Sequence, residues 1–458
     1  MSALATPKDL AVTLASLAGR RVTVVGMARS GVAAAQVAVR RGAKVTCTDA
    51  RAGAPKVEGA TAIYGVHRRE DFIDADVVVV SPGVPAAQPD VAAALLAGVA
   101  VVGELGFAAG LLAASARPPL LLAVSGTNGK STTTHLLAQI LQRAGLRTFA
   151  GGNLGLPLSE AVDGDYDALA VEVSSYQMEL PGGFHPRAAA ILNLSPDHLD
   201  RHGTMDSYAA HKCRMFEQMV PGDWQILASG DARLERVCEV LPGRRVWLNA
   251  YPGVKVEGVN VGNFQLAFSE IAAATPIPLA GFTLPGRHNR ENLAAAVLLA
   301  LCGGVPVDRI DVRGLEGLPH RMEWVAKRGD VDWINDSKAT NIESTLVALR
   351  SVERPAVVLL GGRGKTGADY ERLAGPLRSA RAVVCFGEAG PMIAEGLERA
   401  GLLPGRQSTL DAAIDAAASY AAPGDIVLLS PACASFDEFT DYEHRGRHFA
   451  DRVRGLLP

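Results

Sequence analysis

Short runs of β-branched and aliphatic residues alternate along the chain with longer stretches rich in alanine and leucine. Examples of the short runs are "RRVTVVG", "KVTCTD" and "DVVVVSPG", each followed by a helix-like or turn segment. Continuous apolar runs of this kind are typical of parallel strands that are buried on both faces, and the stretches between them predict crossover helices. The pattern therefore predicts an α/β fold built on parallel sheets.

The alternation restarts twice, which predicts three domains in series. It restarts at "PPLLLAVSG", after a stretch rich in glycine and alanine, and again at "PAVVLLGG", after the turn-rich "RGLEGLPHR". We expect domains over residues 1–109, 110–316 and 317–458, and the length of 458 residues suits this division at about 100 to 200 residues per domain. Sheets in series leave clefts between them, where small-molecule sites tend to form.

One stretch, from Val91 to Ala116, carries a single charge, Glu104, and is long enough to span a bilayer. Glycines divide it into short pieces, so we expect a soluble α/β core there and no membrane span. We also expect no export signal, because Lys8 and Asp9 precede any long apolar run.

The composition argues against nucleic-acid binding. Aromatic residues make up only 5% of the chain and the net charge is −3, so both stacking rings and a positive field are lacking. The six cysteines form no C-x-x-C pair, which favours free thiols in a reducing cytoplasm over a disulfide framework.

The strongest motif is a glycine loop, "GTNGKST", between the strand-like "LLLAV" and the helix-like "TTTHLLAQILQRAG". In this setting backbone N–H groups and a helix N-terminus converge on one place and can bind phosphate. Lys130 would neutralise the β- and γ-phosphate oxygens, and Ser131 would bind magnesium. The loop departs from G-x-x-x-x-G-K-[ST], because its first glycine lies three residues before the second. No guanine-reading N-K-x-D motif is visible, so we expect ATP. The predicted phosphate-binding residues are Gly126, Thr127, Asn128, Gly129, Lys130, Ser131 and Thr132.

Two further apolar runs end in polar residues. Glu172 lies in the first, and Asp197, His198 and Asp200 follow the second. In a doubly wound sheet such strand ends form the crevice beside the phosphate loop, where carboxylate and imidazole can hold a cation. A helix cap with a solvated imidazole is the alternative. Lys212, in "AAHKCRMFE", looks like an exposed helical lysine.

A second glycine turn, "GMARSG", follows the first strand, and Asp49 lies 23 residues beyond Gly26. A glycine turn with an acid at this distance is the dinucleotide fingerprint, in which the acid binds a ribose hydroxyl. Ala28 replaces the central glycine, which weakens the case for NAD. A differently placed nucleotide such as uridine, or a structural turn, remains open.

Eight segments between residues 126 and 439 carry a family resemblance: "GTNGKST", "EVSSYQ", "NLSPDHLDRH", "GRHNREN", "LPHRME", "NDSKATN", "LGGRGKTGAD" and "LSPACASFDEF". Together they resemble the Mur ligases of peptidoglycan synthesis. "NDSKATN" with "SPACASFDEF" is similar to the D-glutamate-adding members, since the diaminopimelate- or lysine-adding relatives typically show an Asp-Asn-Pro-Arg-type motif. The resemblance implies a Rossmann-like domain for a UDP-linked substrate, a central P-loop ATPase-like domain and a Rossmann-like amino-acid domain.

The implied activity is ATP-dependent addition of D-glutamate to UDP-N-acetylmuramoyl-L-alanine through an acyl phosphate, with release of ADP and phosphate. The resemblance also implies magnesium at two sites, a cytoplasmic location and a monomer. Three alternatives stay open: a folate or other amino-acid ligase, an NAD-dependent oxidoreductase, and a nucleotide-sensing scaffold without turnover.

The resemblance assigns roles residue by residue, and ordinary capping or surface charge is the alternative for several of them. For catalysis it implies Lys130, Glu172, His198, Lys212 and Lys338. For metal binding it implies Ser131, Glu172, His198 and Lys212, the last as a carbamate that turns a cation into a carboxylate. For the nucleotide it adds Asn289, Asn292, Arg321 and Asp336. For the UDP substrate it implies Ala28, Arg29, Ser30, Asp49, Arg51 and Gly83, with Asn153 and Ser174 at the muramoyl end. For D-glutamate or the reacting phosphate it implies Lys338, Thr340, Lys365, Ser435, Phe436 and Tyr442.

Overall fold

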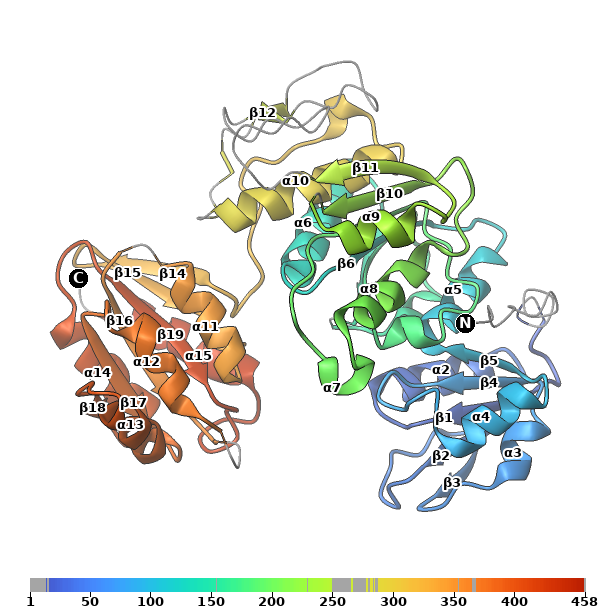
Figure 1. The fold of residues 1–458 in the computed structure, drawn as a ribbon, viewed down its shortest axis with the longest axis horizontal. Coiled ribbons are helices and arrows are strands. Elements are labelled where there is room, and N and C mark those ends of the chain that lie inside the picture. The colour runs from blue at the N-terminus through green and yellow to red at the C-terminus, as the bar shows by residue number, and fades with distance from the viewer. Residues whose placement is uncertain are drawn as a thin grey trace. The chain divides into compact units, whose positions relative to one another are not determined.

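The computed structural model describes residues 14, 16–153, 155–228, 230–248, 265–266, 277–278, 281–282, 284, 287–352, 354–364 and 368–456. The chain divides into two compact units, Met1–Glu316 and Gly317–Pro458 (Figure 1). The first unit holds two large sheets and the second holds one. The predicted α/β class is confirmed, while the limits of the three domains stay a prediction.

The first sheet is parallel throughout, with strand order β3-β2-β1-β4-β5. Its strands are β1 (Arg21–Val25), β2 (Lys44–Asp49), β3 (Thr61–Tyr64), β4 (Val77–Val80) and β5 (Ala100–Gly103). Its helices are α2 (Arg29–Arg40), α3 (Arg69–Ile73), α4 (Pro89–Leu96) and α5 (Glu104–Ala113). All four valines of β4 are buried, as the continuous apolar run predicts.

The apolar stretch from Val91 to Ala116 contains most of α4, all of β5 and all of α5, in agreement with the expected α/β core. None of the helices in the described part of the chain combines the length and the apolar character needed to cross a membrane.

The second sheet has the order β11-β10-β9-β6-β8-β7 and is also parallel. Its strands are β6 (Leu120–Ser125), β7 (Thr148–Gly152), β8 (Ala168–Glu172), β9 (Ala188–Ile191), β10 (Trp224–Ala228) and β11 (Arg244–Leu248). The α-helices are α6 (Lys130–Arg143), α7 (Leu199–His202), α8 (Met205–Cys213), α9 (Ala232–Cys238) and α10 (Arg287–Cys302). Short 3-10 helices are η1 (Leu158–Ala161), η2 (Gln177–Glu179), η3 (Arg214–Phe216) and η5 (Val307–Arg309), and β12 (Gln265–Leu266) pairs with β13 (Ile277–Pro278). Because β6 lies between β8 and β9, the carboxyl ends of these three strands share one edge of the sheet, where ligands of open α/β sheets bind.

The sheet of the second unit has the order β14-β15-β19-β16-β17-β18. Its strands are β14 (Glu323–Arg328), β15 (Val331–Asn335), β16 (Ala356–Gly361), β17 (Ala382–Phe386), β18 (Gly405–Arg406) and β19 (Ile426–Ala432). Its helices are α11 (Ile342–Arg350), η6 (Tyr370–Leu373), α12 (Ala374–Leu377), α13 (Gly390–Arg399), α14 (Leu410–Tyr420) and α15 (Tyr442–Arg454). Asn341, Thr409 and Asp441 begin three of these helices by accepting a hydrogen bond from the backbone N–H three residues later.

The pair β14 and β15 is antiparallel, which departs from the predicted all-parallel sheets. The turn between them has two residues, Gly329 and Asp330, both with positive φ (55° and 61°). A connection this short can only join antiparallel strands, since a parallel pair needs a long crossover.

All six cysteines are free, in agreement with the prediction, and all six are buried. The Sγ atoms of Cys213 and Cys238 lie 3.5 Å apart, a proximity that their spacing in the sequence did not suggest.

Gly31→Ala should destabilise the first sheet by about 1 to 3 kcal/mol, the usual cost of overpacking. A Cβ at this position would lie 1.9 Å from the carbonyl oxygen of Gly26 and 2.8 Å from Ser81 Oγ, so α2 would have to move away from the end of β1. Urea unfolding measures the loss. Gly53→Ala is the matched control, because a Cβ there meets nothing within 4 Å, and an equal loss in both variants would contradict the steric explanation.

Candidate functional site

The glycine loop leaves β6 after Ser125 and enters α6 at Lys130, as the sequence predicted. Gly126 and Gly129 have φ values of 141° and 84°, which residues with a Cβ rarely adopt. No side chain caps the N-terminus of α6, so its first N–H groups can donate to a phosphate. Ser131 and Thr132, in the first turn of the helix, are buried.

Polar side chains beyond β9 hold this loop in shape. Asn193 Oδ1 accepts from the Asn128 N–H at 2.8 Å, and Asn193 Nδ2 donates to the Asn128 carbonyl at 3.0 Å. Thr127 Oγ1 accepts from the Ser195 N–H at 3.0 Å and lies 3.2 Å from the hydroxyl of Tyr208. Asn193, Ser195 and Tyr208 were not predicted as site residues, although the first two lie inside the segment "NLSPDHLDRH".

Two lysines converge on the carbonyl of Gly126. Lys130 Nζ donates to it at 2.9 Å and to the Thr127 carbonyl at 2.8 Å. Lys212 Nζ donates to the same Gly126 carbonyl at 2.8 Å and lies 4.6 Å from the centre of the Tyr208 ring. Lys212 is only 2% exposed, so the interpretation as an exposed helical lysine is wrong. Burial, and then the charge of Lys130, lowers the pKa of Lys212 to about 7.

Glu172 is the last residue of β8 and is 2% exposed. Its Oε1 accepts from Asn153 Nδ2 at 2.8 Å, whereas Oε2 is buried without a partner among the described residues. An unpartnered buried carboxylate oxygen is costly, and carboxylate oxygens are preferred ligands of magnesium. Glu172 therefore fits a magnesium site.

A magnesium ion bound at Glu172 would need further ligands. Within the described ranges, no three His, Cys, Asp or Glu side chains gather closely enough to hold a metal ion. Across the two predicted magnesium sites, the remaining ligands would come from phosphate oxygens, from the Ser131 hydroxyl, from His198 or from a modified Lys212. The charges of Asp197 and Glu172 both act on the Lys212 amine, which places the two carboxylates in its surroundings.

His198 lies beyond β9 in a left-handed conformation, with φ 53°. Its Nδ1 is 3.0 Å from the hydroxyl of Tyr176, and its Nε2 is 3.4 Å from Asp197 Oδ2. The side chain is 46% exposed, so a metal ion or a ligand in solvent can reach it. The alternative of a helix cap fits only by position, because His198 precedes α7 but its side chain makes no capping bond.

The two asparagines predicted for the nucleotide lie at the start of α10. Asn292 Oδ1 is 3.3 Å from Thr133 Oγ1, and a Cβ on Gly129 would come within 2.4 Å of the same oxygen. Asn292 is thus buried against the glycine loop, and Asn289 lies one turn earlier and is partly exposed. Their predicted contact with adenine stays a prediction.

The residues predicted for the UDP group lie at the carboxyl edge of the first sheet, beyond β1, β2 and β4. Asp49 Oδ2 accepts from the Met27 N–H at 2.7 Å, and Arg51 donates to both Asp49 oxygens at 3.0 and 2.9 Å. The hydrogen bonds from Arg51 hold the pKa of Asp49 well below its ordinary value. Asp49 therefore stabilises the glycine turn through its hydrogen bond with Met27. Its predicted contact with a ribose stays a prediction. Ala28 directly precedes α2, and Arg29 and Ser30 are its first two residues. The N-terminus of α2 has no side-chain cap, and Gly83 follows β4.

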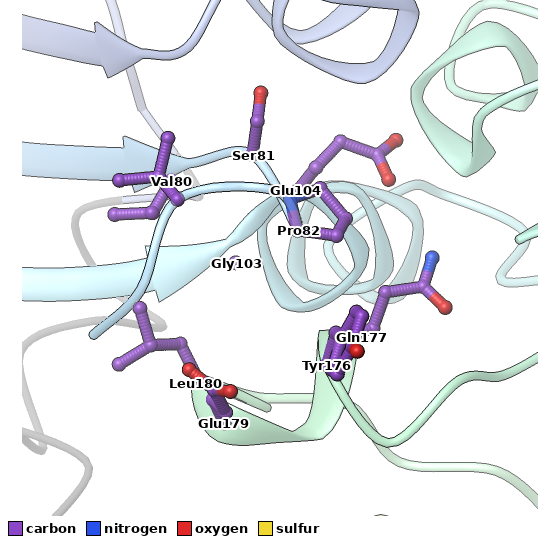
Figure 2. A pocket seen from close by; sticks show the side chains of 10 residues that line it. Val80, Ser81, Pro82, Gly103, Glu104, Tyr176, Gln177, Glu179 and Leu180 are labelled. Atoms are coloured by element: carbon purple, nitrogen blue, oxygen red, sulfur yellow. The ribbon is translucent and has the colours of Figure 1, made fainter. Parts of the chain in front are cut away.

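A pocket with about 240 Å³ of empty space, part of it open to solvent, lies between the ends of β4 and β5 and residues 176–180. Figure 2 shows Val80, Ser81 and Pro82 on one side and Tyr176, Gln177 and Glu179 on the other. Ser174, predicted to face the muramoyl end of the substrate, donates through its N–H and its hydroxyl to Gln177 Oε1 at 2.8 and 3.0 Å.

Two acidic residues with no predicted role, Glu104 and Glu179, connect the two sheets of the first unit at this pocket. Glu104 is fully buried, which raises its pKa to about 7, and its Oε1 accepts from the Ser159 N–H at 2.7 Å. Glu179 Oε2 accepts from the Ala86 N–H at 3.2 Å and pairs with Arg201. Neither residue belongs to a motif, and only contacts between distant segments reveal them.

In the second unit, the predicted acceptor residues follow the ends of neighbouring strands. Lys338 and Thr340 come after β15, and Ser435 and Phe436 after β19, which pairs with β15. Tyr442 is the first residue of α15 and Phe436 is 59% exposed. Lys365 lies outside the described residues.

Asp336, predicted for the nucleotide, is buried at the end of β15. Burial raises its pKa to about 7, although Ser430 Oγ donates to its Oδ2 at 2.8 Å and the charges of Arg321 and Lys338 act in the opposite direction. Arg321 thus lies near enough to Asp336 to interact with it electrostatically, while the nucleotide contact predicted for both residues stays a prediction.

Family models match three successive parts of the chain. They are described as "Mur ligase MurD-like, N-terminal domain" over residues 20–103, "Mur ligase middle domain" over residues 124–300 and "Mur ligase, glutamate ligase domain" over residues 320–433.

Among curated relatives, the chain is 44% identical to the "UDP-N-acetylmuramoylalanine--D-glutamate ligase" of Anaeromyxobacter dehalogenans, over 94% of this chain and 97% of the relative. It is 42% identical to the protein of the same name from Myxococcus xanthus, over 97% of this chain and the whole of the relative.

Solved structures share the fold at low sequence identity. UDP-N-acetylmuramate-alanine ligase MurC from Thermotoga maritima matches with a TM-score of 0.56 and 18% identity, over 95% of this chain and 99% of that one. MurF from Acinetobacter baumannii matches with a TM-score of 0.57 and 18% identity, over 85% and 93%. Three domain models in order and full-length relatives together show that the chain belongs to the Mur ligase family, in the group of the UDP-N-acetylmuramoylalanine–D-glutamate ligases.

Proposed function

We propose that this enzyme joins D-glutamate to UDP-N-acetylmuramoyl-L-alanine, using ATP and releasing ADP and phosphate, in the cytoplasm and as a monomer. One observation carries the proposal: the glycine loop brings Lys130 and Lys212 to one carbonyl, in a chain 44% identical over nearly its full length to a D-glutamate ligase.

The reaction has to overcome the low reactivity of a carboxylate, whose charge repels nucleophiles and whose oxide is a poor leaving group. The L-alanyl carboxylate attacks the γ-phosphorus of ATP, which breaks the bond to ADP and gives an acyl phosphate. The amine of D-glutamate then attacks the carbonyl, the bond to phosphate breaks, and the amine proton passes to solvent. Negative charge develops on phosphoryl oxygens and then on the tetrahedral oxyanion, so the catalytic contribution is mainly positioning and electrostatic.

The residues of the first unit suit the phosphoryl step. The uncapped N-terminus of α6 and Lys130 would hold the β- and γ-phosphates, and Glu172 and Ser131 would hold magnesium. When bound, magnesium neutralises phosphate charge and orients the γ-phosphate for attack. We assign His198 to metal binding, and this assignment excludes it as the base, because a metal-bound imidazole nitrogen cannot also accept a proton.

A second proposed feature is the carbamylation of Lys212, which its buried surroundings favour. A carbamate forms when a neutral amine attacks carbon dioxide and loses a proton. Since burial lowers the pKa of Lys212 to about 7, a substantial fraction of its amine is neutral at neutral pH. The product would be a carboxylate beside the phosphate loop and would complete the ligands for a second magnesium.

The direct test combines purified protein, ATP, magnesium, UDP-N-acetylmuramoyl-L-alanine and D-glutamate, and measures ADP, phosphate and the amide product. We expect all three to form together and to require both substrates. ADP without amide in the presence of every component, or turnover only with a folate acceptor, would contradict the proposal.

Lys365→Ala should raise the KM for D-glutamate by roughly tenfold or more, the effect of losing one charged hydrogen bond of about 1.5 to 3 kcal/mol. We expect this effect because we propose that the ammonium group of Lys365 binds a carboxylate of D-glutamate. The main-chain pairing of Arg363 with Ala434, at 2.8 and 3.1 Å, places the segment just before Lys365 beside the loop of Ser435. Steady-state kinetics at saturating ATP measure the change.

Lys327→Ala is the control for this prediction, because Lys327 is a half-exposed lysine of the same unit that pairs with Asp330 on a hairpin. An unchanged KM for D-glutamate in Lys365→Ala would show that the acceptor carboxylate lies elsewhere.

A further inference from the structure

Arg445 is the one arginine whose side chain is completely buried among the described residues. It lies on α15, and burial lowers its pKa to about 10. Burying a guanidinium is unfavourable unless its donors are satisfied, so the partners of Arg445 indicate why it is there.

The four hydrogen bonds of its guanidinium within the described chain all go to neutral oxygens and none goes to a carboxylate. Nε donates to Ser337 Oγ at 2.9 Å, and Nη2 donates to the Ser337 carbonyl at 2.8 Å. On the other side, Nη2 donates to the Cys433 carbonyl at 3.1 Å and Nη1 to the Ala434 carbonyl at 3.2 Å. One planar group therefore joins two separate loops.

These two loops are the ones that carry the predicted acceptor residues. Ser337 directly precedes Lys338, and Ala434 directly precedes Ser435. A third loop lies against the same group, because a Cβ on Gly362 would come within 2.9 Å of Arg445 Nη1. The three loops follow β15, β19 and β16, which are neighbours in the sheet.

We propose that Arg445 is a positioning residue that fixes the loops after β15 and β19 relative to each other and thereby shapes the site for the amino-acid acceptor. The inference rests on the proposed function, since that function assigns the acceptor to these loops. A lysine could not replace Arg445, because a single ammonium nitrogen cannot place donors on both loops in the way that the planar fork does.

The test compares Arg445→Lys with the wild-type enzyme in two reactions. In the first, D-glutamate is the acceptor. In the second, hydroxylamine replaces it: its nitrogen bonds to the carbonyl of the acyl phosphate, the bond to phosphate breaks, a proton leaves to solvent, and a hydroxamate forms. Hydroxylamine has no carboxylate and needs no shaped amino-acid site.

We expect Arg445→Lys to raise the KM for D-glutamate by roughly tenfold or more while the KM for ATP and the hydroxylamine-dependent release of ADP stay within about threefold of wild type. Arg447→Lys is the matched control, because Arg447 is exposed two residues later on the same helix, and it should behave as wild type. An unchanged KM for D-glutamate, or an equal loss in both reactions, would overturn the inference.

Ser337→Ala decides the matter if Arg445→Lys does not fold. The Ser337 hydroxyl accepts from Arg445 Nε and donates to the Tyr442 carbonyl at 2.8 Å, so its loss weakens the same junction with a smaller change in volume. We expect the KM for D-glutamate to rise by about threefold or more, and an unchanged value would overturn the inference. If the wild-type enzyme forms no ADP with D-glutamate, the proposed function itself fails, which differs from an active enzyme whose variants keep a normal KM.

Discussion

Lys130→Ala should remove about 2 to 4 kcal/mol of transition-state stabilisation. This loss corresponds to a decrease in kcat/KM for ATP of roughly 30- to 1,000-fold. In the structure, the Nζ atom donates to the carbonyls of Gly126 and Thr127 and so lies against the loop that we expect to hold the triphosphate. With ATP bound, the same ammonium would pair with phosphate oxygens, and its charge would count most when the γ-phosphoryl group is transferred. Initial rates of ADP formation measure the effect.

The control for this substitution is Lys56→Ala, since Lys56 is exposed in the first unit and belongs to none of the predicted sites. The free energy of unfolding should change by less than about 1 kcal/mol in Lys130→Ala, because two loop carbonyls lose a partner but can be solvated. If Lys130→Ala kept wild-type turnover, this result would contradict the assignment of the glycine loop to the catalytic site.

Glu172→Gln should lower kcat by roughly 100-fold, in the range of a lost preorganised charge, and should raise the magnesium concentration needed for half-maximal turnover. The amide can still accept from Asn153 Nδ2 and fills nearly the same space, so the substitution removes the charge and leaves the shape. The oxygen that we expect to bind magnesium is Oε2, which is buried and has no partner among the described residues. Turnover measured over a magnesium titration gives both quantities.

Stability separates the catalytic explanation for Glu172 from a structural one. Without magnesium, the free energy of unfolding should stay unchanged or rise in Glu172→Gln, because a buried carboxylate is replaced by a neutral group. Glu160→Gln changes an exposed glutamate of the same unit and is the matched control. A large loss of stability in Glu172→Gln, together with an unaltered magnesium requirement, would contradict a metal-binding role.

The sequence predicted those features that depend on neighbours along the chain. The apolar run of Val77–Val80 became a buried strand, and the glycine loop became the turn between β6 and α6. A buried parallel strand and a phosphate loop are each defined within a short segment, and the physical constraint on each is local. The antiparallel pair β14 and β15 could also have been found, because the Gly329-Asp330 turn is a hairpin signal.

Features that depend on distant segments could not be read from the sequence. Lys212 looks exposed in its own helix, and only the carbonyl of Gly126, 86 residues earlier, accounts for its burial. Asp49 has the spacing of a ribose ligand, but the structure shows that both of its oxygens already bind Met27 and Arg51. The role of Arg445 was missed for the same reason, since its partners lie on two other loops.

The buried cysteines make the enzyme suitable for spectroscopic labelling. Because all six thiols are enclosed by the fold, a maleimide dye should find no ready target on the native surface. Leu96 in the first unit and Leu403 in the second are 91% and 95% exposed, so a cysteine placed at each would give one attachment point per unit. Energy transfer between two such dyes can then report on the distance between the two units while the enzyme turns over.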